Sequence, residues 1–482
     1  MGTGGRILFR AAVPLVLLAC LAACTDRVSF SSDADLWLEF SDDTVSLDTV
    51  FTQTGSPTGA FMIYNRNDRA LKVDVMLAGG ADSPFRINVD GESGTQMNNL
   101  ELRASDSLFC FLSVNIAASD SDTPILVEDS VCFLLESGNR QTVHLMAFGQ
   151  DVIRLYGAVA DSDMNLTSAR PYLIFDSLFI ADGAVLNIAA GARLFFHDGA
   201  WLGGDGRIVA DGTCDSMIVM RGDRLDNLLT DIPYDLSAGR WGGVILNAGS
   251  YDNLLRGCDI HGGRWGVLAD TSDVQLQKVL IDGCIIHNVE GNALELNHCR
   301  SVVSNSQISN AGQHCVSLLG GNNSFDFCTI ANFYPWDVHE SALFISNLAD
   351  TTLFPMSLAD FSNCIITGNS SDEVSGIVRD SVSGMEPAQF CNYSIRHSLV
   401  LVSDTTDEHM TDCVWDRKPH DVYGAANFIH VAKGDFRYDF RLDSLSMARG
   451  IAPSSATSRF DITGLPRPET QADAGCYQYV KP

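Results

Sequence analysis

The sequence predicts an all-β protein in which a β-sandwich is followed by a solenoid of stacked strand-and-turn coils. Three observations lead to this fold class: short alternating strands between residues 36 and 155, a repeat of about 22 residues between 165 and 460, and repeat units without an amphipathic helical pattern. A chain of 482 residues is long enough for one sandwich domain and a long repeat array.

The first block alternates apolar and polar residues in short runs that turn-forming residues interrupt. In the run SLFCFLSV (residues 107–114), every second residue from Leu108 to Val114 is expected to face inward. Comparable runs follow at 131–135 and 142–146. Short strands at this spacing imply a β-sandwich.

Two cysteines of this block, Cys110 and Cys132, leave the question of a disulfide open. An exported protein can oxidise such a pair, but spacing in the sequence does not place their Cβ atoms within bonding range. The sequence is equally compatible with a disulfide and with two buried thiols.

The second block repeats a turn in which an Ile or Val follows a Cys or Ser slot. A unit of this length holds two or three short strands, which cannot bury their inner face alone and must stack on neighbouring coils. The aligned residues lie 26, 22, 22, 36 and 34 positions apart, and they are Ile260, Ile286, Ile308, Ile330, Ile366 and Val400.

The repeat also predicts two ladders of stacked side chains. A free Cys acts as a small hydrophobic residue and suits an inward slot, whereas Asn tolerates the left-handed conformation at a turn and bonds to neighbouring backbone. The expected ladders consist of Cys258, Cys284, Cys328 and Cys364, with Ser306 and Ser398 in the same slot, and of Asn288, Asn310 and Asn332.

Residues 1–24 predict an export signal that ends in a lipobox. Two arginines precede a short apolar run, and small residues then lead to Cys24, which the pattern favours over Cys20 as the lipidated residue. The apolar run is too short to span a bilayer as a helix. Residues 25–35 are polar and predict a tether, so a lipid bilayer is an expected partner through the N-terminal lipid.

Three parts of the chain resemble known families. The segments GAFMIYNRNDRALKVDVMLAGGADSPFRIN and VEDSVCFLLESGNRQTVHLMAFGQ resemble immunoglobulin-like domains of the abnormal-spindle/Hydin type, which implies such a sandwich over residues 36–155. The repeat resembles the right-handed parallel β-helix of the pectate-lyase-like fold, which implies this fold over 165–460. Asp461–Arg467 and Asp473–Tyr477 resemble the closing coil and cap of such helices, which are expected over 461–482.

With the lipobox, nearly the whole chain resembles β-helix lipoproteins of the Bacteroidales type. The resemblance implies a lipid anchor in the outer membrane, facing either the cell surface or the periplasm. It implies no particular activity, because this family has none that is firmly assigned. Function therefore has to be argued from the residues of this chain.

The charge of the chain restricts its partners. The formal net charge is −29 at pH 7, which argues against nucleic acid because no basic surface is available to neutralise phosphates. The same charge repels anionic polysaccharides unless a cation bridges the two.

A carbohydrate-active enzyme is one alternative for the function. A β-helix lyase abstracts a proton with a basic residue, often beside calcium held by carboxylates, so calcium is an expected cofactor only for a lyase. A polygalacturonase-like hydrolase is disfavoured, because the solenoid lacks the Asn-Thr-Asp, Asp-Asp, Gly-His-Gly and Arg-Ile-Lys series of that family. The basic candidates for a lyase are Arg240, Arg256, Arg264, Lys278 and Arg300, with Asp259, Asp270, Asp282 and Glu295 as acidic neighbours.

The stretch DGCIIHNVEGNALELNHC (282–299) concentrates residues that bind metals or transfer protons. The repeat assigns its cysteines to structural positions, so only His287, Glu290 and Glu295 remain unassigned. No Cys-x-x-Cys pair follows Cys24, and the chain has no His-Glu-x-x-His motif. The sequence therefore predicts no metal site.

Aromatic residues in the turns and insertions favour binding over catalysis. Exposed aromatic rings stack on sugars and anchor partners, although the same residues can also fold back over the solenoid. The candidate binding residues are Trp241, Trp265, Phe333, Tyr334 and Trp336. The sequence thus predicts a non-catalytic module that binds a glycan or a cell-surface protein, with a polysaccharide lyase or glycoside hydrolase as the alternative and no assigned catalytic residue.

Overall fold

The structure is a computed structural model that describes residues 29–229, 232–379, 390–416, 425–432, 436–453 and 458–481. The chain divides into two compact units, residues 1–151 and 152–482, and each is described by itself. The predicted export signal, with Cys20 and Cys24, lies outside the described residues. Within the described ranges, no helix is long and apolar enough to cross a membrane.

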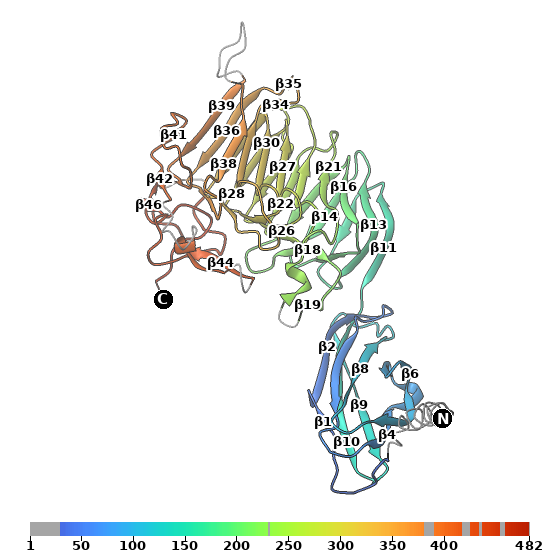
Figure 1. Cartoon of the computed structure of the whole chain (residues 1–482). Helices are drawn as coiled ribbons and strands as arrows, with labels where there is room; N and C mark the ends of the chain where they lie inside the picture. The colour runs from blue at the N-terminus through green and yellow to red at the C-terminus, as the bar shows by residue number, and fades with distance from the viewer. Residues whose placement is uncertain are drawn as a thin grey trace, which may run out of the picture. The chain divides into compact units, whose positions relative to one another are not determined.

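The first unit contains two five-stranded sheets (Figure 1). Neighbouring strands in one sheet are β1 (Glu39–Phe40), β3 (Gly59–Tyr64), β8 (Ser107–Val114), β5 (Phe85–Val89) and β6 (Glu92–Gly94). Neighbouring strands in the other are β2 (Thr44–Phe51), β10 (Arg140–Gln150), β9 (Ile125–Leu135), β4 (Leu71–Leu77) and β7 (Gln96–Leu102). A single-turn 3-10 helix, η1 (Gly80–Asp82), connects β4 to β5.

The two sheets share one hydrophobic core, to which most of the strands contribute alternate residues. The ring of Phe61 on β3 meets the ring of Phe133 on β9 edge-on, with 6.2 Å between their centroids. Cys110 is buried in this core, whereas the alternation along β9 turns Cys132 away from it. Both cysteines are free thiols, and their opposite directions exclude a disulfide between them.

The second unit begins with β11 (Ile153–Ala160) and β13 (Tyr172–Ile180), which pair in parallel and start a solenoid (Figure 1). Most later coils add a strand to each of three stacks, and within a stack consecutive strands pair in parallel. The parallel sheets of this unit agree with the solenoid that the sequence predicts.

The strands of the solenoid are as follows. The first stack consists of β15 (Arg193–Phe196), β18 (Ile218–Gly222), β23 (Cys258–His261), β26 (Ile285–Val289), β29 (Gln307–Ala311), β32 (Thr329–Asn332), β37 (Ile365–Gly368), β40 (Leu399–Val400) and β42 (Val414–Trp415). The second consists of β16 (Trp201–Gly204), β21 (Gly243–Leu246), β24 (Val267–Ala269), β27 (Leu294–Asn297), β30 (Val316–Leu319), β33 (Leu343–Ser346) and β38 (Val374–Ile377). The third consists of β12 (Met164–Leu166), β14 (Val185–Ala189), β17 (Arg207–Asp211), β22 (Asn253–Arg256), β25 (Val279–Asp282), β28 (Arg300–Ser304), β31 (Gly321–Asp326), β36 (Met356–Ser362), β39 (Cys391–Arg396) and β41 (Met410–Thr411).

Among the described residues of the second unit, four short hairpins and two 3-10 turns lie outside the three stacks. The hairpins pair β19 (Asn227–Leu229) with β20 (Ile232–Pro233), β34 (Leu348–Ala349) with β35 (Thr352–Leu353), β43 (Phe428–Ala432) with β44 (Arg437–Leu442), and β45 (Ala452–Pro453) with β46 (Gln471–Ala472). The 3-10 turns are η2 (Tyr234–Leu236) and η4 (Ala425–Asn427).

The first stack carries the repeat in register. Ile260 pairs with Ile286, which pairs with Ile308, and the aligned positions continue pairing to Val400. The preceding cysteines are fully buried at the edge of the solenoid core. The Cys284 thiol, for example, donates a hydrogen bond of 3.3 Å to the carbonyl of Leu255.

Asparagines end the same strands on successive coils. Asn288 and Asn310 both adopt the left-handed conformation, with φ of +52° and +54°. The side-chain amide of Asn310 donates to the Asn288 side-chain oxygen at 3.3 Å. The amide of Asn332 instead donates to the backbone carbonyl of Ala311 at 3.0 Å. These side chains link each coil to its neighbour.

The C-terminal segment, residues 425–481 where described, contains most of the stretch for which a closing coil and cap are predicted (461–482). It packs along the outer side of the first stack, where Ile365 and Leu399 form a separate hydrophobic core with Phe440 and Cys476. The outward residues of the later first-stack strands are apolar, and this segment removes them from water. The last first-stack strand ends at Trp415.

A candidate functional site beside a histidine–aspartate network

Most of the aromatic residues proposed for binding are not available to a ligand. Trp241 is buried: its ring stacks on Phe196 with 4.2 Å between centroids, and its indole N–H donates to the carbonyl of His261 at 2.8 Å. Phe333 and Tyr334 are buried too, and this corrects their assignment as binding residues. The turns fold these rings back onto the solenoid, because that removes large apolar surfaces from water.

Two of the proposed aromatic residues remain accessible. Trp336 is 37% exposed, its indole N–H donates to the carbonyl of Leu236 at 3.0 Å, and its ring lies 4.7 Å from that of Phe436. Trp265 is half-buried beneath the guanidinium of Arg264.

The basic residues considered for a lyase do not converge. Arg256 pairs with Asp211 and Asp282, and Arg264 pairs with Glu290. Lys278 is fully buried, and its ammonium donates to the carbonyl of Asn247.

The other lyase candidates also have separate partners. Arg240 donates to the hydroxyl of Ser237, and Arg300 donates to the carbonyl of Gln275. Asp270 accepts a bond from the amide of Thr271. Glu295 accepts bonds from Asn292 and Asn297 on the second stack.

A histidine–aspartate network on the outer face of the first stack brings together residues that the sequence separates. His261 Nδ1 lies 2.8 Å from Asp259 Oδ1, and His287 Nε2 lies 3.2 Å from the same oxygen. On its other side, His261 Nε2 lies 2.6 Å from Oδ1 of Asp235 in η2. Arg221 on β18 completes the network with a bond of 2.9 Å to Asp235.

The register of the coils explains this convergence. Asp259 pairs with Ile285 and His261 pairs with His287, so two outward side chains of β23 lie beside the outward histidine of β26. Arg221 directly follows Met220, which pairs with Ile260, and this places it one coil before His261. Adjacent coils therefore build the network without any motif that is continuous in the sequence.

The charges of the network support one another. Burial alone would lower the pKa of His261, but Asp259 and Asp235 outweigh it and raise that pKa to about 9. Burial alone would raise the pKa of Asp259, but His261 and His287 hold it well below its usual range. At neutral pH, His261 is thus an imidazolium between two carboxylates.

A groove opens next to the network, between the first stack and the C-terminal segment. Its volume is about 290 Å³. Its polar walls come from β26 and β29, and its aromatic walls come mainly from the C-terminal segment. The lining includes Asn288, Gln307, Ser309 and Asn310; Phe436, Tyr438, Phe440 and Tyr477; and the charged residues Asp259, His287, Asp439 and Arg441.

Hydrogen bonds fix the groove walls. The hydroxyl of Tyr477 donates to the Gln307 side-chain oxygen at 2.7 Å, and the Gln307 amide donates to Ser309 Oγ at 2.9 Å. The hydroxyl of Tyr438 donates to the carbonyl of Phe333 at 3.2 Å. The candidate binding residue Phe333 therefore supports the groove from beneath.

Both carboxylates of the groove are held in their charged form. Hydrogen bonds from Arg441, 2.6 Å away at the closest, lower the pKa of Asp439. The pKa of Asp259 is lowered as well. A glycoside hydrolase needs one carboxyl group that stays protonated to serve as the acid, and neither carboxylate fits that role.

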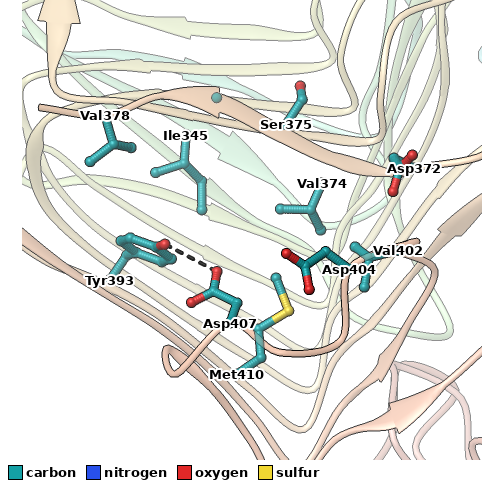
Figure 2. A pocket seen from close by; sticks show the side chains of 11 residues that line it. Ile345, Asp372, Val374, Ser375, Val378, Tyr393, Val402, Asp404, Asp407 and Met410 are labelled. Carbon is teal, nitrogen blue, oxygen red and sulfur yellow. Dashed lines mark hydrogen bonds between the residues drawn. The ribbon is translucent and has the colours of Figure 1, made fainter. Parts of the chain in front are cut away.

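A second cavity, of about 320 Å³, lies among the later coils (Figure 2). Figure 2 shows Tyr393 pointing toward Asp407, to which its hydroxyl donates at 3.1 Å. Apolar side chains such as Ile345 and Val374 form much of its wall and belong to, or pack against, the solenoid core. Among the described residues that line it there is no lysine, arginine or histidine. This makes it a weaker candidate than the groove.

The network could also hold a metal ion, contrary to the prediction of no metal site. One ligand atom from each of Asp259, His261 and His287 lies within 4.8 Å of the others. The sequence contained one usable signal, since each histidine directly follows an aligned isoleucine of the repeat. The position after the aligned isoleucine holds other residue types on the other coils, so the repeat did not reveal the pair of histidines.

Comparisons with known proteins identify part of the second unit. Residues 242–404 match the family model described as the right-handed β-helix region, and Asp259, His287 and Gln307 fall within this match. No curated protein matches the chain.

Two solved structures show only distant similarity. A family 123 glycoside hydrolase from Clostridium perfringens, studied for glycolipid glycan hydrolysis, has a TM-score of 0.19 and 8% identity, covering 25% of this chain and 26% of its own. The chain thus spans about a quarter of that enzyme's length. The ASH/PapD-like domain 7 of human CEP192 has a TM-score of 0.17 and 10% identity, covering 26% of this chain and 92% of its own. Scores this low carry no argument about function.

Proposed function

We propose that this chain is an exported lipoprotein, anchored through Cys24 to the outer membrane, whose β-helix binds a glycan in the groove. The lipobox motif supports the anchor. In this proposal the first unit is an immunoglobulin-like domain that spaces the β-helix from the lipid, and the β-helix is of the Bacteroidales lipoprotein type.

The composition of the groove is the observation that carries the proposal. Aromatic rings line one side, with the half-buried ring of Tyr438 accessible to a ligand, and the buried amide and hydroxyl groups of Gln307 and Ser309 line the other. Sugar rings present apolar faces that stack on aromatic rings, and their hydroxyls bond to fixed polar groups. A groove on the side of a solenoid also suits a long chain better than a small molecule.

A carbohydrate-active enzyme remains the second candidate, favoured by one observation. His287 lines the groove within 3.2 Å of Asp259, and Arg441 lines the same groove. A histidine oriented by a carboxylate can abstract a proton, which fits elimination by a polysaccharide lyase. Hydrolysis is less well supported, since both carboxylates of the groove are ionised.

A glycan-array screen of the mature chain, followed by product analysis of each hit, tests the proposal. We expect at least one oligosaccharide to be retained and recovered uncleaved. Recovery of shorter products with a new carbon–carbon double bond would instead establish the lyase. If no glycan is retained, the proposed function is wrong.

A further inference from the structure

We infer that Asp259, His261 and His287 form a binding site for one divalent transition-metal ion of the Zn²⁺ type. The site goes beyond the proposed function, because an ion can bind there whether or not a glycan occupies the groove. One carboxylate and two imidazoles form a ligand set that Zn²⁺ commonly accepts.

The geometry is close to that of a bound ion. With metal–ligand bonds of about 2.0–2.2 Å, neighbouring ligand atoms of a tetrahedral site lie roughly 3.4 Å apart. Asp259 Oδ1 lies 2.8 Å from His261 Nδ1 and 3.2 Å from His287 Nε2. The two imidazole rings lie side by side, 4.7 Å apart. All three ligand atoms lie within 4.8 Å of one another. Binding of the ion requires His261 Nδ1 to release its proton to solvent and the three side chains to adjust their positions around the ion.

The outer partner of His261 strengthens the inference. Histidines that bind metals usually donate their other ring N–H to a carboxylate, which fixes the ring and the tautomer. Asp235 lies 2.6 Å from His261 Nε2, on the side of the ring away from Asp259. Arg221 in turn holds Asp235 at 2.9 Å. Asp235 is thus a positioning residue, distinct from the three ligands.

The site has an open side toward the groove. Asp259 and His287 line the groove, whereas His261 is buried behind them. Three protein ligands with a free fourth position are characteristic of zinc sites that accept an external ligand. An ion here would present positive charge to the groove of a chain whose net charge is −29. It would supply the cation that an anionic glycan needs in order to approach.

The inference is tested by titrating the mature chain with Co²⁺. The chain carries no tag and is first treated with EDTA and dialysed. We expect one equivalent of Co²⁺ to bind with the visible absorption of a low-coordinate ion, and Zn²⁺ to displace it. His287→Gln and Asp259→Asn should each weaken binding at least tenfold. His314→Gln, a half-buried histidine that bonds to the carbonyl of Ser341 outside the network, should leave binding unchanged.

Other outcomes overturn the inference. If wild-type protein shows no saturable Co²⁺ binding, or if His287→Gln binds as tightly as wild type, there is no metal site and the network is a purely proton-linked ion pair. His287 is half-exposed, so this variant is expected to fold even if Asp259→Asn does not. Because no glycan is present in the titration, its failure would leave the proposed glycan binding untouched.

Discussion

The Nε2 atom of His287 lies 3.2 Å from Oδ1 of Asp259, although 28 residues separate them in the chain. The contact exists because one turn of the solenoid returns the chain to the same place, with Asp259 paired to Ile285. It lies on the outer face of the first stack, at the wall of the groove. The inward side chains of the repeat form the core, and the same register thus brings outward polar side chains such as Asp259 and His287 into contact.

We expect Cys214 to be the first thiol to react with a disulfide reagent in the native protein. It is exposed, whereas most of the other described cysteines are buried. Burial also raises the pKa values of Cys110 and Cys299 to about 12, so that few thiolates form there. Ellman's reagent separates fast-reacting from slow-reacting thiols in the native protein. Cys214→Ser should remove the fast phase of this reaction. Rapid reaction of Cys258 or Cys284 would contradict the buried ladder.

The ladder slot should tolerate Ser but not a larger residue. Ser306 occupies the slot one coil after Cys284, and its hydroxyl donates to the carbonyl of Ser304 at 2.7 Å. Cys284→Ser should therefore cost less than about 1 kcal/mol of unfolding free energy, whereas Cys284→Leu overpacks the slot and should cost about 1–3 kcal/mol. Urea denaturation checks both values. Equal losses would mean that the slot is not tightly packed.

The ladder and the network show what the sequence could and could not reveal. The inward positions, such as Ile286 and Cys284, repeat on coil after coil, because stacking forces like side chains into like slots. The outward positions carry no such constraint. His261 and His287 follow aligned isoleucines, but Ser309 and Ala331 hold the equivalent places on the next coils.

The burial of three candidate aromatic residues, Trp241, Phe333 and Tyr334, was not predicted for a related reason. Trp241 precedes two glycines, which suggested an exposed turn, but it pairs with Gly263 in an isolated bridge and its ring enters the core. Small neighbours made room for the ring. The groove itself was not predictable, because its C-terminal wall comes from a segment, with residues 436–441 and Tyr477, that is far from the first-stack strands β26 and β29 in the sequence. That segment's contact with Gln307, through Tyr477, spans 170 residues.

Lys278 should make stability depend on pH above neutrality. Burial lowers the pKa of Lys278 to about 8, from an unfolded value of 10.5. Below pH 8 the folded chain must hold a buried charge, so this lysine destabilises it there, and the penalty disappears as pH rises from 8 to 10.5. The full difference is on the order of 3 kcal/mol.

Lys278→Met isolates this effect, because Met has a similar shape and does not titrate. We expect the stability of wild type relative to Lys278→Met to rise between pH 7.5 and 10 (roughly the window between the two pKa values). Chemical denaturation of both proteins at each pH measures the difference. A difference independent of pH would show that the ammonium is solvated rather than buried.

The most direct test of the groove is the affinity of wild type and two tyrosine variants for a glycan found in the array screen. Tyr438 lines the groove, and Tyr393 lines the second cavity; both are half-buried. Truncation of an aromatic contact residue that dominates a binding site costs about 2 kcal/mol or more. We predict that Tyr438→Ala weakens binding tenfold or more while Tyr393→Ala matches wild type. Unchanged affinity in Tyr438→Ala, or a larger loss in Tyr393→Ala, would contradict the assignment of the groove.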